Sequence, residues 1–204
     1  AVPIWAVPGD TYARFRLSTT GGFGVGGAAD AEKVLSPIIA SGRRVLAVPG
    51  NMDGEDARRW MEEQGFSIHG RGVLVSGIGF IGLGGSNPTP FGTPFEVANE
   101  EAGRLLVNAL SQVASAPFKV LLSHAPPRGT RLDRGFAGMH VGSPAVREFV
   151  LSGSVGLCLC GHIHESPGEE ILGGTMCVNL GPFKNGHCAL VDITGGAARI
   201  LWRK

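Results

Sequence analysis

The sequence predicts an α/β domain in which a sheet with parallel strand pairs is covered by helices. Apolar strand-like runs alternate with amphipathic helical segments through the first half of the chain, and this order is typical of parallel strands joined by helices. Polar residues able to bind a ligand directly follow several of these runs, and α/β proteins bind ligands at such strand ends. The 33 glycines suit a fold with many tight turns.

The length and composition predict one domain and argue against binding to nucleic acid or to a membrane. A chain of 204 residues is long enough for one domain with a sizeable core, and no long linker or repeat divides residues 1–204. The formal net charge of +1 gives no case for stable nucleic-acid binding. Because the sequence has no signal-peptide pattern and no apolar run of about 18 residues, we expect a cytoplasmic protein without a membrane partner.

The four cysteines are predicted to be reduced thiols. Cys158 and Cys160 share one face of a predicted buried strand, and Cys177 and Cys188 lie in other apolar runs. This usage favours buried free thiols over a disulfide framework. A zinc site built on Cys158 and Cys160 is a weaker alternative, because no second cysteine pair accompanies them.

The first half of the chain is predicted to alternate strands and helices. Asp30 is a good N-cap and Gly42 a good stop for a helix between them, while residues 11–27 have no clear period and are predicted to be loop. Charged side chains give the second helix a solvated face: Asp56, Arg58, Arg59, Glu62 and Glu63. The remaining predicted elements here are strands over 2–8 and 44–48, a helix over 54–64, and a hairpin with strands 73–75 and 78–83.

The second half begins with an irregular loop over residues 84–91, and loops of this length usually carry function or cover a site. A helix over 99–114 follows, with Ala102, Leu106, Leu110 and Val113 on one face. The remaining predicted elements are a strand over 118–122, a short helix over 143–151, a buried strand over 155–160, and a meander of strands over 170–172, 175–180, 188–193 and 198–202.

Two histidines directly follow the apolar run that ends at Cys160. Gly161 breaks the strand, and His162 and His164 come next with one residue between them. We expect the backbone freedom of Gly161 to let both imidazoles turn into one cleft. Imidazole is a common ligand of zinc, manganese and iron, so the pair predicts a metal site. The alternative is two loop histidines that face solvent.

The same pattern recurs along the chain, with a polar residue just past the end of an apolar strand. It occurs at Asp10, Asn51 and His124 as well as at His162 and His164. Strand ends that converge on one edge of a sheet can build a single site. One carboxylate, one amide oxygen and three imidazoles form a mixed set suited to Mn, Fe or Zn. Each residue alone also has an ordinary explanation as a turn residue.

These residues resemble a known family. The segments Gly50-Asn51-Met52-Asp53, Ser123-His124-Ala125-Pro126-Pro127 and Gly161-His162-Ile163-His164 resemble the later motifs of the calcineurin-like metallophosphoesterases. Five segments are further similar to the Icc-related predicted phosphoesterases within that superfamily: 84–94, 123–134, 140–143, 161–166 and 179–186. The resemblance covers about residues 26–194, whereas residues 1–25 are atypical.

The resemblance implies a four-layer α/β sandwich, in which helices flank two mixed sheets, with two divalent metal ions about 3.5–4 Å apart. By position in the motifs, Asn51, His124 and His162 are implied ligands of one ion, and His164 of the other. The implied activity is hydrolysis of a phosphomonoester or phosphodiester by attack of a metal-activated water. The implied partner is a small phosphorylated substrate, such as a nucleotide.

The amino-terminal part departs from the family pattern. The family has a D-x-H motif on its first strand and a Gly-Asp motif on its second, whereas this chain has only Gly9-Asp10-Thr11-Tyr12. Either Tyr12 stands where the histidine belongs, or Asp10 is the bridging ligand and the first strand is absent; we favour the second interpretation. Under either interpretation, one of the two metal ions lacks part of its ligands. The chain could therefore bind two ions or retain only one. A truncation or frameshift before Gly26 is a third explanation.

Met52 is a second departure, because many relatives have a histidine there, paired with the following acid, which here is Asp53. Methionine cannot transfer a proton. His69 or His140 could take over this role, and Arg128 or Arg131 could instead hold the phosphate. We expect Asp53, His140 and Arg128 to take part in catalysis.

Two alternatives to an efficient monomeric enzyme stay open. A catalytically impaired relative would bind metal and a phosphorylated ligand without efficient turnover, which the missing D-x-H histidine and Met52 favour. The apolar loop from Pro88 to Phe95 could line a pocket or form the contact of a homodimer.

Overall fold

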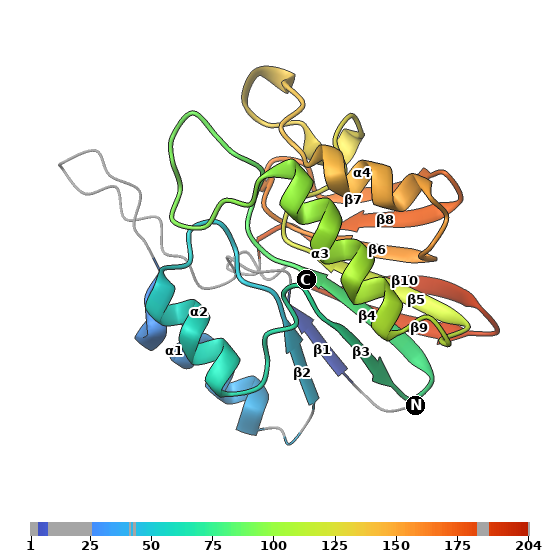
Figure 1. Cartoon of the computed structure of the whole chain (residues 1–204), viewed down its shortest axis with the longest axis horizontal. Helices are drawn as coiled ribbons and strands as arrows, with labels where there is room; N and C mark the ends of the chain where they lie inside the picture. The colour runs from blue at the N-terminus through green and yellow to red at the C-terminus, as the bar shows by residue number, and fades with distance from the viewer. Residues whose placement is uncertain (1–3, 8–25, 41, 43, 183–187, 204) are drawn as a thin grey trace.

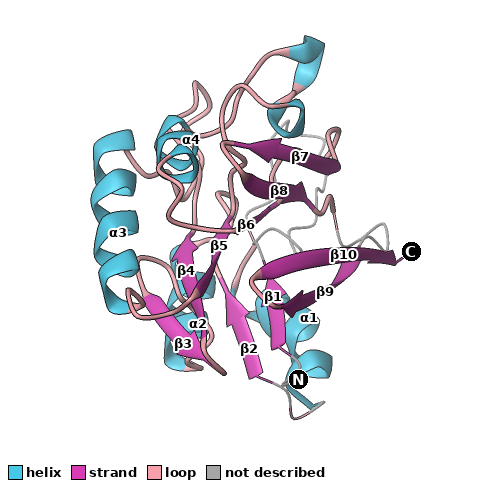
Figure 2. Ribbon diagram, turned by 90° about the vertical axis from the view of Figure 1, so that its right-hand side faces the viewer, coloured by secondary structure: helices cyan, strands magenta, loops and turns pink. Residues whose placement is uncertain are grey.

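The computed structural model describes residues 4–7, 26–40, 42, 44–182 and 188–203. The chain folds into four layers in the order helices, sheet, strands and helices (Figures 1 and 2). This confirms the predicted α/β sandwich. The central layer is a mixed six-stranded sheet in the order β3-β4-β5-β6-β8-β7. Its strands are β3 (Gly72–Val75), β4 (Ile78–Leu83), β5 (Phe118–Ser123), β6 (Leu157–Cys160), β7 (Gly168–Leu172) and β8 (Thr175–Asn179).

Helices α3 (Asn99–Gln112) and α4 (Pro144–Leu151) cover one face of the six-stranded sheet (Figure 2). On α3 the buried stripe falls at successive turns, because side chains three and four positions apart share one face of a helix. The apolar face predicted for this helix is confirmed at Ala102, Leu106 and Val113. Ala109 is also buried, whereas Leu110 is only partly buried. The main buried side chains of this layer are Ile81, Leu83, Leu121, Cys158 and Cys177 from the sheet, Ala102, Leu106, Ala109 and Val113 around α3, and Val146, Phe149 and Val150 from α4.

The opposite face of the sheet packs against a second β layer. This layer holds the parallel pair β1 (Ile4–Val7) and β2 (Arg44–Ala47), and the antiparallel pair β9 (Cys188–Thr194) and β10 (Ala197–Arg203). Successive side chains of a strand point to opposite faces, so Val120 and Leu122 enter this core while Leu121 enters the other. Among the described residues, the second layer is two separate pairs rather than one mixed sheet.

The fourth layer is formed by α1 (Ala28–Ala40) and α2 (Glu55–Glu63), which lie beside β2 (Figure 1). Their contact is a small apolar core of Ala31, Leu35, Ala47, Ala57 and Met61. Because α2 begins directly after the Asp53-Gly54 pair, this packing also fixes the segment that carries Asn51.

Two details of this half differ from the sequence predictions, and one predicted region is not described. The helix begins at Ala28 rather than after Asp30, and the Asp30 carboxylate accepts a hydrogen bond from Gly27 N at the helix start. Arg58 is not on a solvated face: its guanidinium stacks over the Phe95 ring at 4.3 Å, because the loop after β4 covers this side of α2. Asp10 and most of the patternless segment over 11–27 lie outside the described residues.

The predicted meander over residues 170–202 is divided between two layers. The turns at Gly173-Gly174 and Gly195-Gly196 each close an antiparallel hairpin. Strands β8 and β9 do not pair, however, because β8 runs parallel to β6 inside the six-stranded sheet. The hairpin over β3 and β4 is confirmed, with Ser76 and Gly77 both at positive φ in the two-residue turn.

Gly82 in β4 allows a close backbone approach that can be tested. An alanine Cβ at this position would lie 2.2 Å from the carbonyl oxygen of Ile68, so we expect Gly82→Ala to lower the free energy of unfolding by about 1–3 kcal/mol. At Gly103 in α3, an added Cβ would meet no heavy atom within 4 Å, so Gly103→Ala should raise it by about 0.5–1 kcal/mol. Urea denaturation of both variants measures this; effects of the same sign would contradict the packing described here.

Candidate metal centre

Three side chains that the sequence predicts as metal ligands meet at one edge of the sheets. Asn51 follows β2, His124 follows β5, and His162 follows β6. Nε2 of His124 lies 3.1 Å from Oδ1 of Asn51 and 3.1 Å from Nδ1 of His162. Strands β5 and β6 run parallel, so both histidines leave the sheet at the same edge.

His124 is the centre of this group and is fully buried. Its backbone N–H donates to the carbonyl of Leu83 at the end of β4 (2.9 Å), and its carbonyl accepts from Gly161 N (3.0 Å). Main-chain hydrogen bonds to both neighbouring segments therefore fix where the His124 side chain leaves the sheet.

Asn51 is presented by a tight turn that Asp53 closes. The Asp53 carboxylate is fully buried and accepts a hydrogen bond from Gly50 N at 2.6 Å. The carbonyl of Asn51 accepts from Phe95 N at 3.0 Å, which attaches the turn to the loop after β4. Asp53 thus has a structural contact that the sequence did not predict, and its part in catalysis stays a prediction.

The turn that carries His162 differs from the expectation. The unusual backbone angle is at His162 itself, with a φ of +66°, and not at Gly161. Ile163 N donates to the carbonyl of Gly161 at 2.7 Å, which closes a three-residue turn centred on His162. A non-glycine residue in this region costs about 1–3 kcal/mol and persists where surrounding contacts enforce it. Here Asn179 Nδ2 donates to the carbonyl of Ile163 at 2.8 Å and holds the turn.

The predicted residues for a second ion are placed only in part. His164 is half-buried in the turn that follows that of His162, where Ser166 N donates to the carbonyl of Ile163, and Asp10 lies outside the described residues. Across the part of the chain that the structure describes, no group of three or more His, Cys, Asp and Glu side chains is arranged to hold a metal. The group around His124 has two histidines, and its third member is an amide.

The donor atoms around His124 fit a divalent ion. Metal–nitrogen and metal–oxygen bonds of about 2.0–2.2 Å place neighbouring ligand atoms about 3.0–3.5 Å apart. The two separations of 3.1 Å lie in this range. Two imidazole nitrogens with one amide oxygen form a set that Mn, Fe and Zn accept.

A glycine-rich loop after β4 lies against the Asn51 turn. A Cβ on Gly84 would lie 2.7 Å from the carbonyl oxygen of Pro49, and Gly85, at a φ of +75°, donates its N–H to that oxygen at 2.9 Å. The close contact at Gly84 leaves no room for a side chain, and the positive φ at Gly85 favours glycine. The sequence predicted an irregular loop here without indicating this contact.

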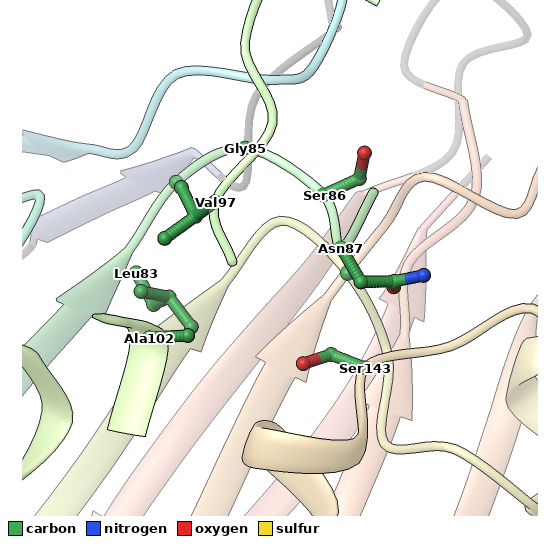
Figure 3. Close-up of a pocket in the computed structure, with 9 residues that line it drawn as sticks. Leu83, Gly85, Ser86, Asn87, Val97, Ala102 and Ser143 are labelled. Carbon is green, nitrogen blue, oxygen red and sulfur yellow. The ribbon is translucent and has the colours of Figure 1, made fainter. Parts of the chain in front are cut away.

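A small pocket lies under this loop (Figure 3). Leu83, Val97 and Ala102 line one side, while Asn87 and Ser143 line the other. Oγ of the buried Ser86 and Oδ1 of Asn87 have no hydrogen-bond partner among the described residues. A water molecule would satisfy them, because buried polar groups in proteins are commonly bridged by ordered water. Nothing in the sequence pattern indicated these two oxygens.

The loop from Pro88 to Phe95 is closed by Glu96. Its carboxylate accepts hydrogen bonds from the backbone N–H and the hydroxyl of both Thr89 and Thr93. Burial alone would raise the pKa of Glu96, but these hydrogen bonds lower it to about 2. Phe91 at the tip is 77% exposed, and its predicted part in a pocket or homodimer contact stays a prediction.

His140 and Arg128 lie on the loop after β5. Nδ1 of His140 is 2.7 Å from Oδ1 of Asp133, which is fully buried. Burial opposes ionisation of Asp133, yet the hydrogen bonds from His140 and from backbone N–H groups lower its pKa. The Arg128 side chain is exposed, as is that of Arg131, so phosphate binding by either stays a prediction.

His69 has a structural contact rather than a position in the His124 group. Its Nδ1 accepts a hydrogen bond from Gly84 N at 2.9 Å, and its ring packs edge-on against Phe95 at 5.1 Å. Burial, with the nearby charge of Arg58, lowers the pKa of His69 to about 4. A neutral His69 therefore supports the glycine-rich loop.

Comparison with known proteins identifies the class. The calcineurin-like phosphoesterase family model matches residues 4–166. Over 145 residues, which are 68% of this chain, the sequence is 36% identical to an uncharacterized protein, MJ1162, of Methanocaldococcus jannaschii. The chain spans 64% of the length of that relative.

Two solved structures share the fold. TT1561 of Thermus thermophilus superposes with a TM-score of 0.65 at 16% identity, covering 97% of this chain and 96% of that one. A proposed 5'-nucleotidase from Staphylococcus aureus, in complex with alpha-ketoglutarate, gives a TM-score of 0.54 at 12% identity and covers 97% of this chain but 43% of that one.

The chain belongs to the calcineurin-like phosphoesterase family, so the predicted resemblance is confirmed. Members of this family are hydrolases that bind divalent metal ions. None of the helices in the described parts of the chain has the length and apolar character needed to cross a membrane.

The lowered pKa of His69 predicts a loss of stability in mild acid. Well above pH 6.5, His69 is neutral in both the folded and the unfolded chain. As the pH falls from 6.5 toward 4, the unfolded chain binds a proton that the folded chain does not, so the free energy of unfolding should fall, by about 2 kcal/mol at pH 4.5. The contribution levels off only well below pH 4, where the folded chain has also bound the proton.

Urea denaturation at pH 7 and pH 4.5 measures this effect, with His69→Gln as the matched variant. Glutamine can still accept from Gly84 N but does not titrate, so its loss between the two pH values should be smaller by about 2 kcal/mol. An equal loss in the two proteins would show that His69 is not the titrating group.

Proposed function

We propose that this chain hydrolyses a phosphomonoester or phosphodiester with the help of bound divalent metal. The observation that carries the proposal is the meeting of Asn51 Oδ1, His124 Nε2 and His162 Nδ1 from three separate strand ends. A phosphate ester is anionic and repels hydroxide, so its hydrolysis needs positive charge at the phosphate. A divalent ion bound by these residues would supply that charge and lower the pKa of the attacking water.

The chain's own residues have distinct proposed parts. Asn51, His124 and His162 hold one ion, and buried main-chain contacts keep their donor atoms in place before any ligand binds. His164 and Asp10 are the proposed ligands of a second ion. Asp53 holds the Asn51 turn, and Arg128 on its exposed loop is the proposed contact for the phosphate.

The proposed substrate is a small phosphorylated molecule, with nucleotides among the candidates. The net charge of +1 gives no electrostatic case for binding a nucleic-acid strand. The fold shared with the proposed 5'-nucleotidase from Staphylococcus aureus fits this class of substrate. Manganese is the proposed metal, and the cytoplasm the proposed location.

An impaired relative is the second candidate, and Met52 favours it. This side chain is buried, with 7% of its surface exposed, at the position where many relatives have a histidine. Such a protein would bind metal and a phosphorylated ligand, and would be stabilised by both, without efficient turnover.

We expect His162→Gly to abolish Mn²⁺-stimulated hydrolysis of bis(p-nitrophenyl) phosphate and to remove at least one bound ion per chain. Glycine removes the imidazole and tolerates the φ of +66°, so the backbone turn is retained. Activity is measured spectrophotometrically, and bound metal by elemental mass spectrometry after excess Mn²⁺ is removed.

Ser76→Gly is the matched control, because Ser76 also has a positive φ (51°) but lies in the β3–β4 turn. It should keep both the activity and the metal content. Unchanged turnover in His162→Gly would contradict the proposal. Metal-dependent stabilisation of the wild-type chain with no turnover of any phosphoester would support the impaired relative instead.

A further inference from the structure

We propose that Asp133 is a positioning residue that holds His140 as the proton donor to the leaving group of the phosphoester. This inference rests on the proposed function, and it assigns the role that Met52 cannot perform.

The Asp133 carboxylate is held in place by burial and by several hydrogen bonds. It is fully buried, and besides His140 it accepts hydrogen bonds from the backbone N–H groups of Gly129 (3.0 Å), Thr130 (2.9 Å) and Gly142 (3.0 Å). Gly129 and Gly142 lie on opposite sides of the loop. The carboxylate therefore ties the two ends of the loop together and cannot move without breaking these hydrogen bonds.

His140 is oriented by this carboxylate and still reaches solvent. Its Nδ1 lies 2.7 Å from Asp133 Oδ1, and its side chain is 37% exposed. Because Nδ1 donates to the carboxylate, the exchangeable proton is the one on Nε2. The imidazolium form carries a proton on both ring nitrogens, and it is the form that can give up the Nε2 proton.

The loop is attached directly to the turn that carries His162. Asn179 Nδ2 donates both to the carbonyl of Leu132, next to Asp133, and to the carbonyl of Ile163. Ser166 Oγ donates to the carbonyl of Arg134 at 2.7 Å. Two polar side chains thus join the Asp133 loop, on both sides of Asp133, to the segment that carries His162.

In the proposed step, a water molecule displaces the leaving group from phosphorus. The oxygen of the attacking water forms a new bond to phosphorus, and the bond between phosphorus and the leaving oxygen breaks. His140 Nε2 gives its proton to the leaving oxygen, which departs as an alcohol. The proton lost by the water returns the imidazole to its charged state. Asp133 stays ionised throughout.

Substrates with different leaving groups can distinguish proton donation by His140 from a purely structural role. A p-nitrophenolate can leave as an anion, whereas an alkyl alcohol needs a proton in order to leave. For His140→Gln, which can still donate to Asp133, we expect kcat to fall about 100-fold or more on glycerol 2-phosphate, whose leaving group is an alkyl alcohol. On p-nitrophenyl phosphate kcat should fall less than about 3-fold, with KM unchanged on both, because a proton donor is not needed there.

Asp133→Asn tests the positioning role. It should reproduce the selective loss on the alkyl ester, and ¹⁵N NMR should show that neutral His140 no longer keeps its proton on Nδ1. Arg134→Gln, on the same loop and next to Asp133, is the matched control and should leave both activities unchanged. If Asp133→Asn does not fold, the His140→Gln comparison still decides the inference.

Equal losses on the two esters, or no loss, would overturn the inference while leaving the proposed function intact. A wild-type chain that cleaves neither these two monoesters nor bis(p-nitrophenyl) phosphate with any divalent metal would overturn both.

Discussion

The burial of His124 at the end of β5 is the constraint on which the candidate metal centre depends. A buried imidazole must have partners for its polar atoms, and here the backbone of His124 is bonded to the end of β4 and to Gly161. Its Nε2 then lies between Asn51 and His162. The two apolar cores on either face of the sheet keep the strands in register, so the positions of these donor atoms are a consequence of packing far from them.

Close backbone contacts do the rest of the positioning. Glycines at 82, 84 and 85 let β4 and the segment after it approach Ile68, Pro49 and Phe95 more closely than any side chain would permit. The positive φ of His162 is a comparable constraint at the other end of the site: a strained turn is held by Asn179, and the imidazole is aimed at His124. Strain of this kind is tolerated where the surrounding structure determines it.

The polar residues around the centre form two separate supports. Asp53 and the loop closed by Glu96 hold the Asn51 side, while Asp133, Asn179 and Ser166 hold the His162 side. Both supports rely on hydrogen bonds between polar side chains and the backbone, and this arrangement fixes loops without regular secondary structure. The edge that carries the candidate metal centre is therefore built from loops that are fixed on the sheet by hydrogen bonds.

The sequence by itself determined the class of fold and the residues that converge. Alternating apolar runs and helical stripes predicted the strands and helices, and the segments with Asn51, His124 and His162 predicted the family and the site, because these signals are local in the chain. Only the tertiary structure decided the rest. The division of the C-terminal strands between two layers, the unusual backbone angle at His162 instead of Gly161, and the pairing of Asp133 with His140 all depend on contacts between segments far apart in the chain or on the geometry of a folded loop. Such contacts leave no periodic pattern in the sequence, so they become visible only when the layers have packed.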